Sequence, residues 1–82
     1  MVKIEIQDNF KNATWKLKHK ETYFQVMGQM SKIINNPDIG KPMMHERKGT
    51  REVYVGSFRL SYCYEPENDL IVFLDLYHKD EQ

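Results

Sequence analysis

The chain has 82 residues, with twelve Lys and Arg balanced by twelve Asp and Glu, so its formal net charge at pH 7 is zero. A domain of this length buries only about 60% of the surface that its unfolded chain exposes, which excludes large cofactor-binding folds. A content of 40% hydrophobic and 29% charged residues favours a soluble globular protein over a disordered or membrane protein. We therefore expect residues 1–82 to form one domain.

The charges are unevenly distributed along the chain. Residues 1–59 contain eleven basic and six acidic side chains, whereas residues 60–82 contain one basic and six acidic side chains. Such an asymmetry predicts either a basic working face suited to nucleic acid or a mixed, solvated surface. The sequence leaves both interpretations open.

Cysteine content and the start of the chain indicate the compartment. Cys63 is the single cysteine, so an internal disulfide is excluded. No apolar stretch near the start has the length or the flanking residues of a signal peptide. We expect a cytoplasmic protein with no membrane partner.

The first part of the chain predicts a strand followed by two helices. Val2, Ile4 and Ile6 alternate with charged residues, a period of two that predicts a short strand with one buried face. Asp8 is the expected N-cap of a first helix. The apolar face of this helix carries Phe10, Ala13 and Leu17. A second helix is marked by a stripe of Tyr23, Phe24, Met27, Met30, Ile33 and Ile34. It must end near Pro37, because the residue before a proline is pushed out of the α region.

The second part of the chain predicts a sheet. Residues 37–49 are polar and rich in proline and glycine, which indicates an irregular segment. Residues 51–55 and 58–64 flank Gly56-Ser57 and predict a tight hairpin, and residues 70–77 predict a central strand covered on both faces. The order β-α-α-β-β-β predicts an α+β fold, in which a helical hairpin joined around residues 19–22 packs on a curved, mainly antiparallel four-stranded sheet.

Three short motifs stand in order along these elements. They are Gly40-Lys41-Pro42, then Arg51-Glu52-Val53-Tyr54-Val55-Gly56-Ser57-Phe58-Arg59-Leu60, and finally Leu76-Tyr77-His78-Lys79. In this order and spacing the chain resembles the RelE/ParE family of toxins from type II toxin–antitoxin systems over essentially its whole length. Members of that family show a GxP loop, a hairpin ending in valine, glycine, any residue, an aromatic and arginine, and a last strand closing on a histidine or basic residue.

The resemblance implies a function and a set of partners. It implies a toxin that is neutralised by a cognate antitoxin protein and that cleaves mRNA on the ribosome as a metal-independent endoribonuclease, an mRNA interferase without a cofactor. One alternative is a non-enzymatic ParE-like inhibitor of DNA gyrase, and another is a degenerate relative that only binds its antitoxin. The zero net charge is the main objection to a ribosomal target, since toxins that enter the ribosome are usually basic.

Two residues are predicted to be catalytic. RNA cleavage of this kind needs a base for the 2′-hydroxyl proton, cationic side chains for the phosphorane-like state and an acid for the leaving 5′ oxygen. His78 is predicted for proton transfer, because histidine titrates at about pH 6.5 and the family keeps a histidine or basic residue there. Arg59 is predicted to bind the scissile phosphate through its planar guanidinium. The competing interpretations are a surface histidine near a chain end and an exposed arginine paired with Glu52.

Five further residues are predicted to contact RNA. Arg47, Lys48 and Arg51 form a basic stretch suited to phosphate contacts. Lys79 adds another positive charge, and Tyr77 is suited to stacking on a base. The competing interpretation is solvated charges for the basic residues and a core position for Tyr77.

No metal site and no carboxylate base are expected. The three histidines lack ligand spacing, and the lone cysteine cannot complete a zinc site. The family's carboxylate, where present, sits near the GxP motif, where this chain has Met43. That departure argues against Glu46 as the base.

Overall fold

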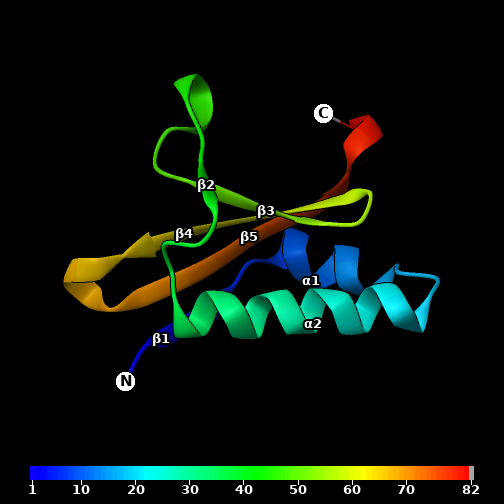
Figure 1. The fold of residues 1–82 in the computed structure, drawn as a ribbon, viewed down its shortest axis with the longest axis horizontal. Helices are drawn as coiled ribbons and strands as arrows, with labels where there is room; N and C mark the ends of the chain where they lie inside the picture. The colour runs from blue at the N-terminus through cyan, green and yellow to red at the C-terminus, as the bar shows by residue number, and fades with distance from the viewer. Residues whose placement is uncertain (82) are drawn as a thin grey trace.

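The computed structural model describes residues 1–81 as two helices packed on one face of a five-stranded mixed sheet (Figure 1). The strand order is β1-β5-β4-β3-β2, with β1 parallel to β5 and the other neighbouring pairs antiparallel. The elements are β1 Lys3–Ile6, α1 Asp8–Trp15, α2 Lys20–Asn35, β2 Lys41–Pro42, β3 Arg51–Val55, β4 Phe58–Glu65 and β5 Leu70–His78. Short 3-10 helices, η1 His45–Arg47, η2 Pro66–Asn68 and η3 Lys79–Glu81, follow β2, β4 and β5.

The predicted α+β architecture is confirmed, and the predicted count of four strands is wrong. The fifth strand, β2, has two residues and pairs with β3 through Lys41 opposite Glu52 and Pro42 opposite Arg51. A two-residue strand that contains a proline leaves no alternating pattern in the sequence. The segment was therefore indistinguishable from a loop.

Strand β1 forms where predicted, but its predicted buried face is wrong. Ile4 and Ile6 are 44% and 37% exposed. The reason is that β1 is an edge strand, while α1 packs mainly on β5 and α2 mainly on β3. Val2, just before the strand, is the residue of this segment that packs against the core.

Helix α1 begins at Asp8 rather than after it. Gln7 is the N-cap, so the predicted Asp8 cap is wrong. Asp8 lies in the first turn, where the partial positive charge of the helix N-terminus favours its carboxylate. Residues 16–19 connect α1 to α2, earlier than expected, and Leu17 packs against the core from this connection.

The apolar stripe predicted for α2 is partly buried. Ile33 is fully buried together with Val26, which the predicted stripe omitted. Tyr23 and Phe24 are 43% and 65% exposed. Phe24 precedes Val26 by two residues, which places it about 200° away around the helix axis. No helix formed by residues 1–81 combines the length and the apolar character needed to cross a membrane.

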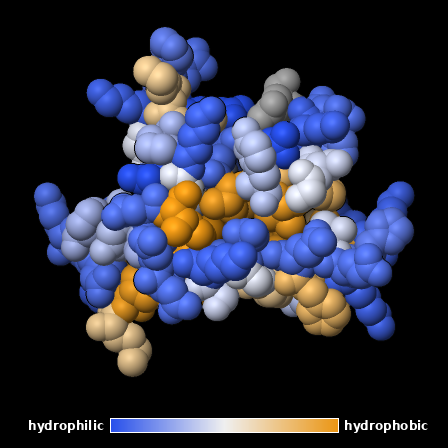
Figure 2. Space-filling model, in the orientation of Figure 1, coloured by the Kyte–Doolittle hydropathy of each residue, from blue (hydrophilic) through white to orange (hydrophobic). Residues whose placement is uncertain are grey.

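The core lies between the helices and the inner strands β3, β4 and β5. Its largest fully buried side chains include Tyr62, Phe10 and Phe73. The Phe73 ring centroid lies 5.5 Å from that of Phe10 and 6.4 Å from that of Tyr62. Figure 2 shows that apolar side chains also reach the surface along the line between α2 and the sheet. Ile39 and Val53 line a hollow together with Gln29 of α2.

A β-bulge in β5 interrupts the alternation of side chains. Tyr62 of β4 lies opposite Phe73, but Ser61 lies opposite Asp75, so Leu74 is the extra residue. A bulge of one residue moves every later side chain to the other face of the sheet. Leu76 thereby points into the core, where it is 3% exposed.

The hydroxyl of Tyr62 ties the loop after α2 to the sheet. It accepts a hydrogen bond from the Gly40 backbone N–H at 2.9 Å and donates one to the Pro37 carbonyl oxygen at 2.7 Å. Arg51 holds the same loop, since its Nη1 donates to the carbonyl oxygens of Asp38 and Gly40 at 3.0 and 2.8 Å. Gly40 leaves no room for a side chain, because a Cβ there would lie 2.6 Å from the Tyr62 hydroxyl. Burial raises the pKa of Tyr62, so this hydroxyl stays protonated.

Gly40→Ala is expected to lower the free energy of unfolding by about 1–3 kcal/mol, because the added methyl displaces the buried Tyr62. The matched control is Gly28→Ala in the middle of α2, where a Cβ meets no described atom within 4 Å. This control is expected to raise the free energy of unfolding by about 0.5–1 kcal/mol. Urea unfolding followed by circular dichroism measures both values. Similar effects of the two substitutions would contradict the close packing of Gly40 against Tyr62.

Candidate functional site

The face of the sheet that carries no helix, which we call the open face, presents two rows of side chains. Strand register defines the rows, because residues opposite one another on neighbouring strands share a face. The first row is Tyr54, Arg59 and Tyr77, from β3, β4 and β5. The second row is Glu52, Ser61 and Asp75. The bulge at Leu74 is what brings Asp75 and Tyr77 to this face.

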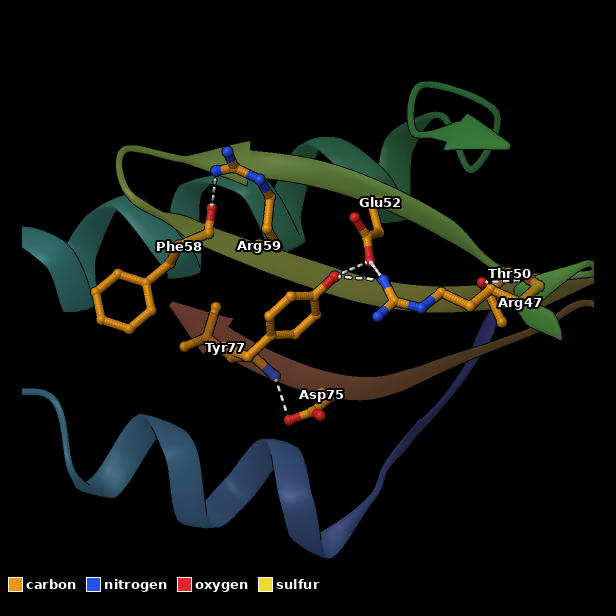
Figure 3. A network of polar contacts seen from close by, with 8 residues as sticks. Arg47, Thr50, Glu52, Phe58, Arg59, Asp75 and Tyr77 are labelled. Carbon is orange, nitrogen blue, oxygen red and sulfur yellow. Dashed lines mark hydrogen bonds and ion pairs between the residues drawn. The ribbon is translucent and has the colours of Figure 1, made fainter. Parts of the chain in front are cut away.

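Arg59 lies at the centre of the first row. Its guanidinium carbon lies 3.9 Å from the centroid of the Tyr54 ring. This cation–π contact holds the Arg59 side chain toward the neighbouring strand β3. Its Nη1 donates to the carbonyl oxygens of Gly56 and Phe58 at 3.3 and 3.1 Å, and Figure 3 shows the bond to Phe58. Within residues 1–81, Arg59 forms no ion pair with a carboxylate. The predicted site residue therefore keeps a positive charge that no acidic side chain of the described chain neutralises, and the competing pairing with Glu52 does not form.

Glu52 joins Arg47 and Tyr77 in a second group, which we call the Glu52 cluster (Figure 3). Arg47 extends from η1 over the sheet, and its Nη1 donates to Glu52 Oε2 at 3.0 Å and to the Tyr77 hydroxyl at 2.7 Å. The Tyr77 hydroxyl donates to the same carboxylate oxygen. Glu52 is 5% exposed, so it is a buried carboxylate satisfied by two donors.

The environment of Arg47 stabilises its charge. The hydrogen bond and the charge interaction with Tyr77, followed by the Glu52 carboxylate, raise the pKa of Arg47 above its ordinary value. The guanidinium carbon also lies 5.5 Å from the centroid of the Tyr77 ring. Arg47 is therefore permanently charged but is already paired with a carboxylate.

The hollow beside this cluster is acidic. Its lining includes Glu46, Glu52, Asp75 and Glu81, against Arg47 as the basic side chain. Two of these acidic residues, Asp75 and Glu81, come from the acidic last part of the sequence. The fold thus mixes the charges on this half of the open face, which favours the predicted mixed surface over the predicted basic working face.

His78 lies on the opposite side of the sheet from Arg59. Phe58 of the neighbouring strand β4 lies opposite His78, and the two rings make an edge-to-face contact with centroids 5.4 Å apart. His78 Nδ1 accepts a hydrogen bond from the Asp80 backbone N–H at 3.2 Å and lies 3.3 Å from Asp80 Oδ2. The structure therefore does not bring the two predicted catalytic residues together, and their catalytic roles stay predictions.

The other predicted RNA contacts differ in their surroundings. Arg51 is engaged by the loop after α2, and its Nη2 also lies 3.5 Å from Asp38 Oδ1. Lys48 and Lys79 are both exposed and form no ion pair within residues 1–81. Of the residues predicted to contact RNA, Tyr77 lies directly opposite Arg59 on the neighbouring strand.

Sequence reasoning missed Glu52 and Tyr54 as members of the site. Their signal was present in the alternation of β3, since Glu52 and Tyr54 are two residues apart and must share a face. Nothing in the sequence, however, indicated that η1 would bring Arg47 onto the same face. Among residues 1–81, no group of three or more His, Cys, Asp or Glu side chains could hold a metal ion.

Solved structures of similar fold are toxins of toxin–antitoxin systems. The toxin–antitoxin complex RelBE2 from Mycobacterium tuberculosis matches at a TM-score of 0.81 and 23% identity, over 94% of this chain and 96% of that chain. YafQ from E. coli strain BL21(DE3) matches at 0.76 and 23% identity, over 99% and 97%. The YoeB/ParE toxin from Agrobacterium tumefaciens matches at 0.83 and 10% identity, over 94% and 98%. The chain therefore has the fold of the RelE, YoeB and YafQ toxins.

The sequence comparisons give no further assignment. No protein-family model matches the sequence, and no curated protein matches it.

Tyr77→Phe is expected to lower the free energy of unfolding by about 1–3 kcal/mol, because the buried Glu52 carboxylate loses a hydrogen-bond donor. Tyr54→Phe is the matched control, since Tyr54 is 61% exposed and its hydroxyl has no hydrogen-bond partner in the described part of the chain. That control is expected to change the free energy by less than about 0.5 kcal/mol. Urea unfolding at pH 7 measures both. Equal small effects would show that the hydrogen bond from Tyr77 to Glu52 contributes nothing to stability.

Proposed function

We propose that this chain is the toxin of a type II toxin–antitoxin pair and a metal-independent endoribonuclease that cleaves mRNA on the ribosome in the cytoplasm. The position and charge of Arg59 are the main support for this activity. The chain shares its fold with RelE-type toxins. On the open face, the Arg59 guanidinium has no carboxylate partner in the described chain and lies opposite Tyr77 of the neighbouring strand β5. A fixed planar cation of this kind fits the charge of a scissile phosphate.

The chemistry requires Arg59 and a proton acceptor on the same face. Arg59 would bind two non-bridging oxygens of the phosphate. The 2′-hydroxyl would give its proton to the Tyr77 hydroxyl oxygen, while Tyr77 passes its own proton to Glu52 Oε2, the partner it already has. The 2′ oxygen then attacks phosphorus, the bond to the 5′ oxygen breaks, and the departing oxygen takes a proton from water.

His78 is the second candidate for proton transfer. Its residue type suits an acid or base near neutral pH. A phosphate bound by Arg59 on the open face would lie across the sheet from the His78 imidazole, which is why the Glu52 cluster is assigned first.

RNA contacts outside the reacting phosphate would come from exposed groups around the open face. Tyr54 is largely exposed, and a base stacked on an aromatic ring contributes roughly 1–3 kcal/mol. Lys48 and Lys79 would bind backbone phosphates, whereas Arg47 and Arg51 are occupied by carboxylate and carbonyl partners. Lys48 and Lys79 are therefore the stronger proposals for backbone contacts.

The activity is tested by inducing the chain in a growing bacterium and mapping transcript 5′ ends within minutes. Wild type is expected to create new ends inside translated messages, and Arg59→Ala to reduce them by roughly 10²–10³-fold. Arg59→Lys should recover part of this loss, because it restores the charge without the planar fork. Lys20→Ala, which removes one charge at the start of α2, is the matched control and should cleave like wild type.

The same measurement assigns proton transfer. Glu52→Gln and Tyr77→Phe are expected to lose cleavage while His78→Ala retains it. Loss of cleavage in His78→Ala, with cleavage retained in Glu52→Gln and Tyr77→Phe, would assign proton transfer to His78. Growth arrest with intact transcripts in wild type would contradict the ribonuclease altogether.

A second candidate function is binding without catalysis, and the acidic hollow favours it. Four carboxylates beside Tyr77 repel RNA, while a protein partner with basic side chains would complement them. The candidates are ParE-like inhibition of DNA gyrase and a degenerate module that binds only an antitoxin. Inhibition of supercoiling by purified wild type, unchanged in Arg59→Ala, would favour gyrase.

We propose a cognate antitoxin as the partner of this chain for each of these candidate functions. The RelBE2 relative was solved as a toxin–antitoxin complex, which supports a partner of this class for a chain of the same fold. Coexpression with the product of an adjacent small gene is expected to give a stable complex. No arrest of growth on induction of the chain alone would favour the degenerate module.

A further inference from the structure

We propose that this chain forms a symmetric dimer through the free edge of β1. Strand β1 lies at one end of the sheet and pairs only with β5 among the described strands. All four of its residues are exposed. An edge strand of this kind presents unpaired backbone N–H and C=O groups, to which another strand can add.

The backbone hydrogen bonds identify which residues face the free edge. Lys3 N–H donates to the Asp69 carbonyl oxygen at 2.7 Å, and Gln7 N–H donates to the Phe73 carbonyl oxygen at 2.9 Å. Alternate residues of a strand direct their backbone groups to opposite neighbours. The odd-numbered residues 3, 5 and 7 therefore bond toward β5, and Val2, Ile4 and Ile6 direct their N–H and C=O groups to the free edge. An antiparallel copy must then place even-numbered residues opposite even-numbered residues.

The charges of Lys3 and Glu5 favour one of the antiparallel registers that place even-numbered residues opposite each other. A twofold axis through Lys3 would place Lys3 opposite Lys3 of the second copy, and an axis through Glu5 would place two glutamates opposite each other. An axis through Ile4 instead pairs Lys3 with Glu5 of the second copy, twice. Opposite charges directly across two strands stabilise the pairing, whereas like charges oppose it. In the central register Lys3 and Glu5 form the non-hydrogen-bonded pairs, whose side chains lie closest together.

The side chains on both faces of β1 fit this register. Neither Lys3 nor Glu5 forms an ion pair within residues 1–81. On the helix side, Ile4 would meet Ile4 of the second copy, and Ile6 would meet Val2. These contacts would cover Ile4 and Ile6, which are 44% and 37% exposed in the single chain. The two five-stranded sheets would then form one continuous sheet of ten strands.

The test is sedimentation velocity on the purified chain over a concentration series, with circular dichroism to monitor folding. Wild type is expected to change from monomer to dimer with concentration. Lys3→Glu and Glu5→Lys should each weaken the dimer at least tenfold, because each places like charges opposite one another. Lys11→Glu, a charge reversal on the exposed side of α1, is the matched control and should dimerise like wild type.

Mixing the variants makes the test specific for this register. An equimolar mixture of Lys3→Glu and Glu5→Lys is expected to form a heterodimer, and the double variant should regain the homodimer, since both arrangements restore opposite charges. A wild-type chain that stays monomeric at every concentration would overturn the proposal. So would a dimer that the single charge reversals leave unchanged.

Discussion

The bulge at Leu74 is the constraint on which the candidate site depends. A regular β5 would continue the alternation of Ile71 and Phe73 and would turn Tyr77 toward the helices. The extra residue reverses that alternation, which lets Leu76 fill the core opposite Leu60 and sends Tyr77 to the open face beside Arg59. The same shift turns His78 toward Phe58 on the helix side. One residue of register thus decides which titratable groups share a face.

A second constraint fixes the segment that delivers Arg47. The Tyr62 hydroxyl and the Arg51 guanidinium hold the loop after α2 against the sheet, and Gly40 permits the close approach. From that loop β2 pairs with β3, and η1 follows, from which Arg47 reaches Glu52. The ring of Tyr62 packs in the core, while its hydroxyl forms hydrogen bonds with the loop. Tyr62 therefore couples the packing of the core to the geometry of the site.

The sequence predicted the fold better than it predicted the site. Both helices, the Gly56-Ser57 hairpin and the inner position of β5 follow from periodicity and turn residues, which are local properties. The bulge was not predictable, because Leu74 is one apolar residue in a nearly continuous apolar strand and no local pattern marks it as extra. The resemblance led to Arg59 as a site residue, and the strand register of the structure puts it on the open face. The pairing of Arg47 with Glu52 depends on a loop conformation that leaves no periodic signal.

The proposed ribonuclease requires that the open face, and not the helix face, contacts RNA. Tyr54 on the open face and Phe24 on α2 are 61% and 65% exposed, so they are matched positions for a photo-crosslinking benzoyl-phenylalanine. The most direct measurement is to induce each substituted chain, irradiate the cells and identify the crosslinked partner. We expect RNA crosslinked to position 54 and none to position 24. RNA crosslinked to position 24 alone, or to neither position, would contradict it.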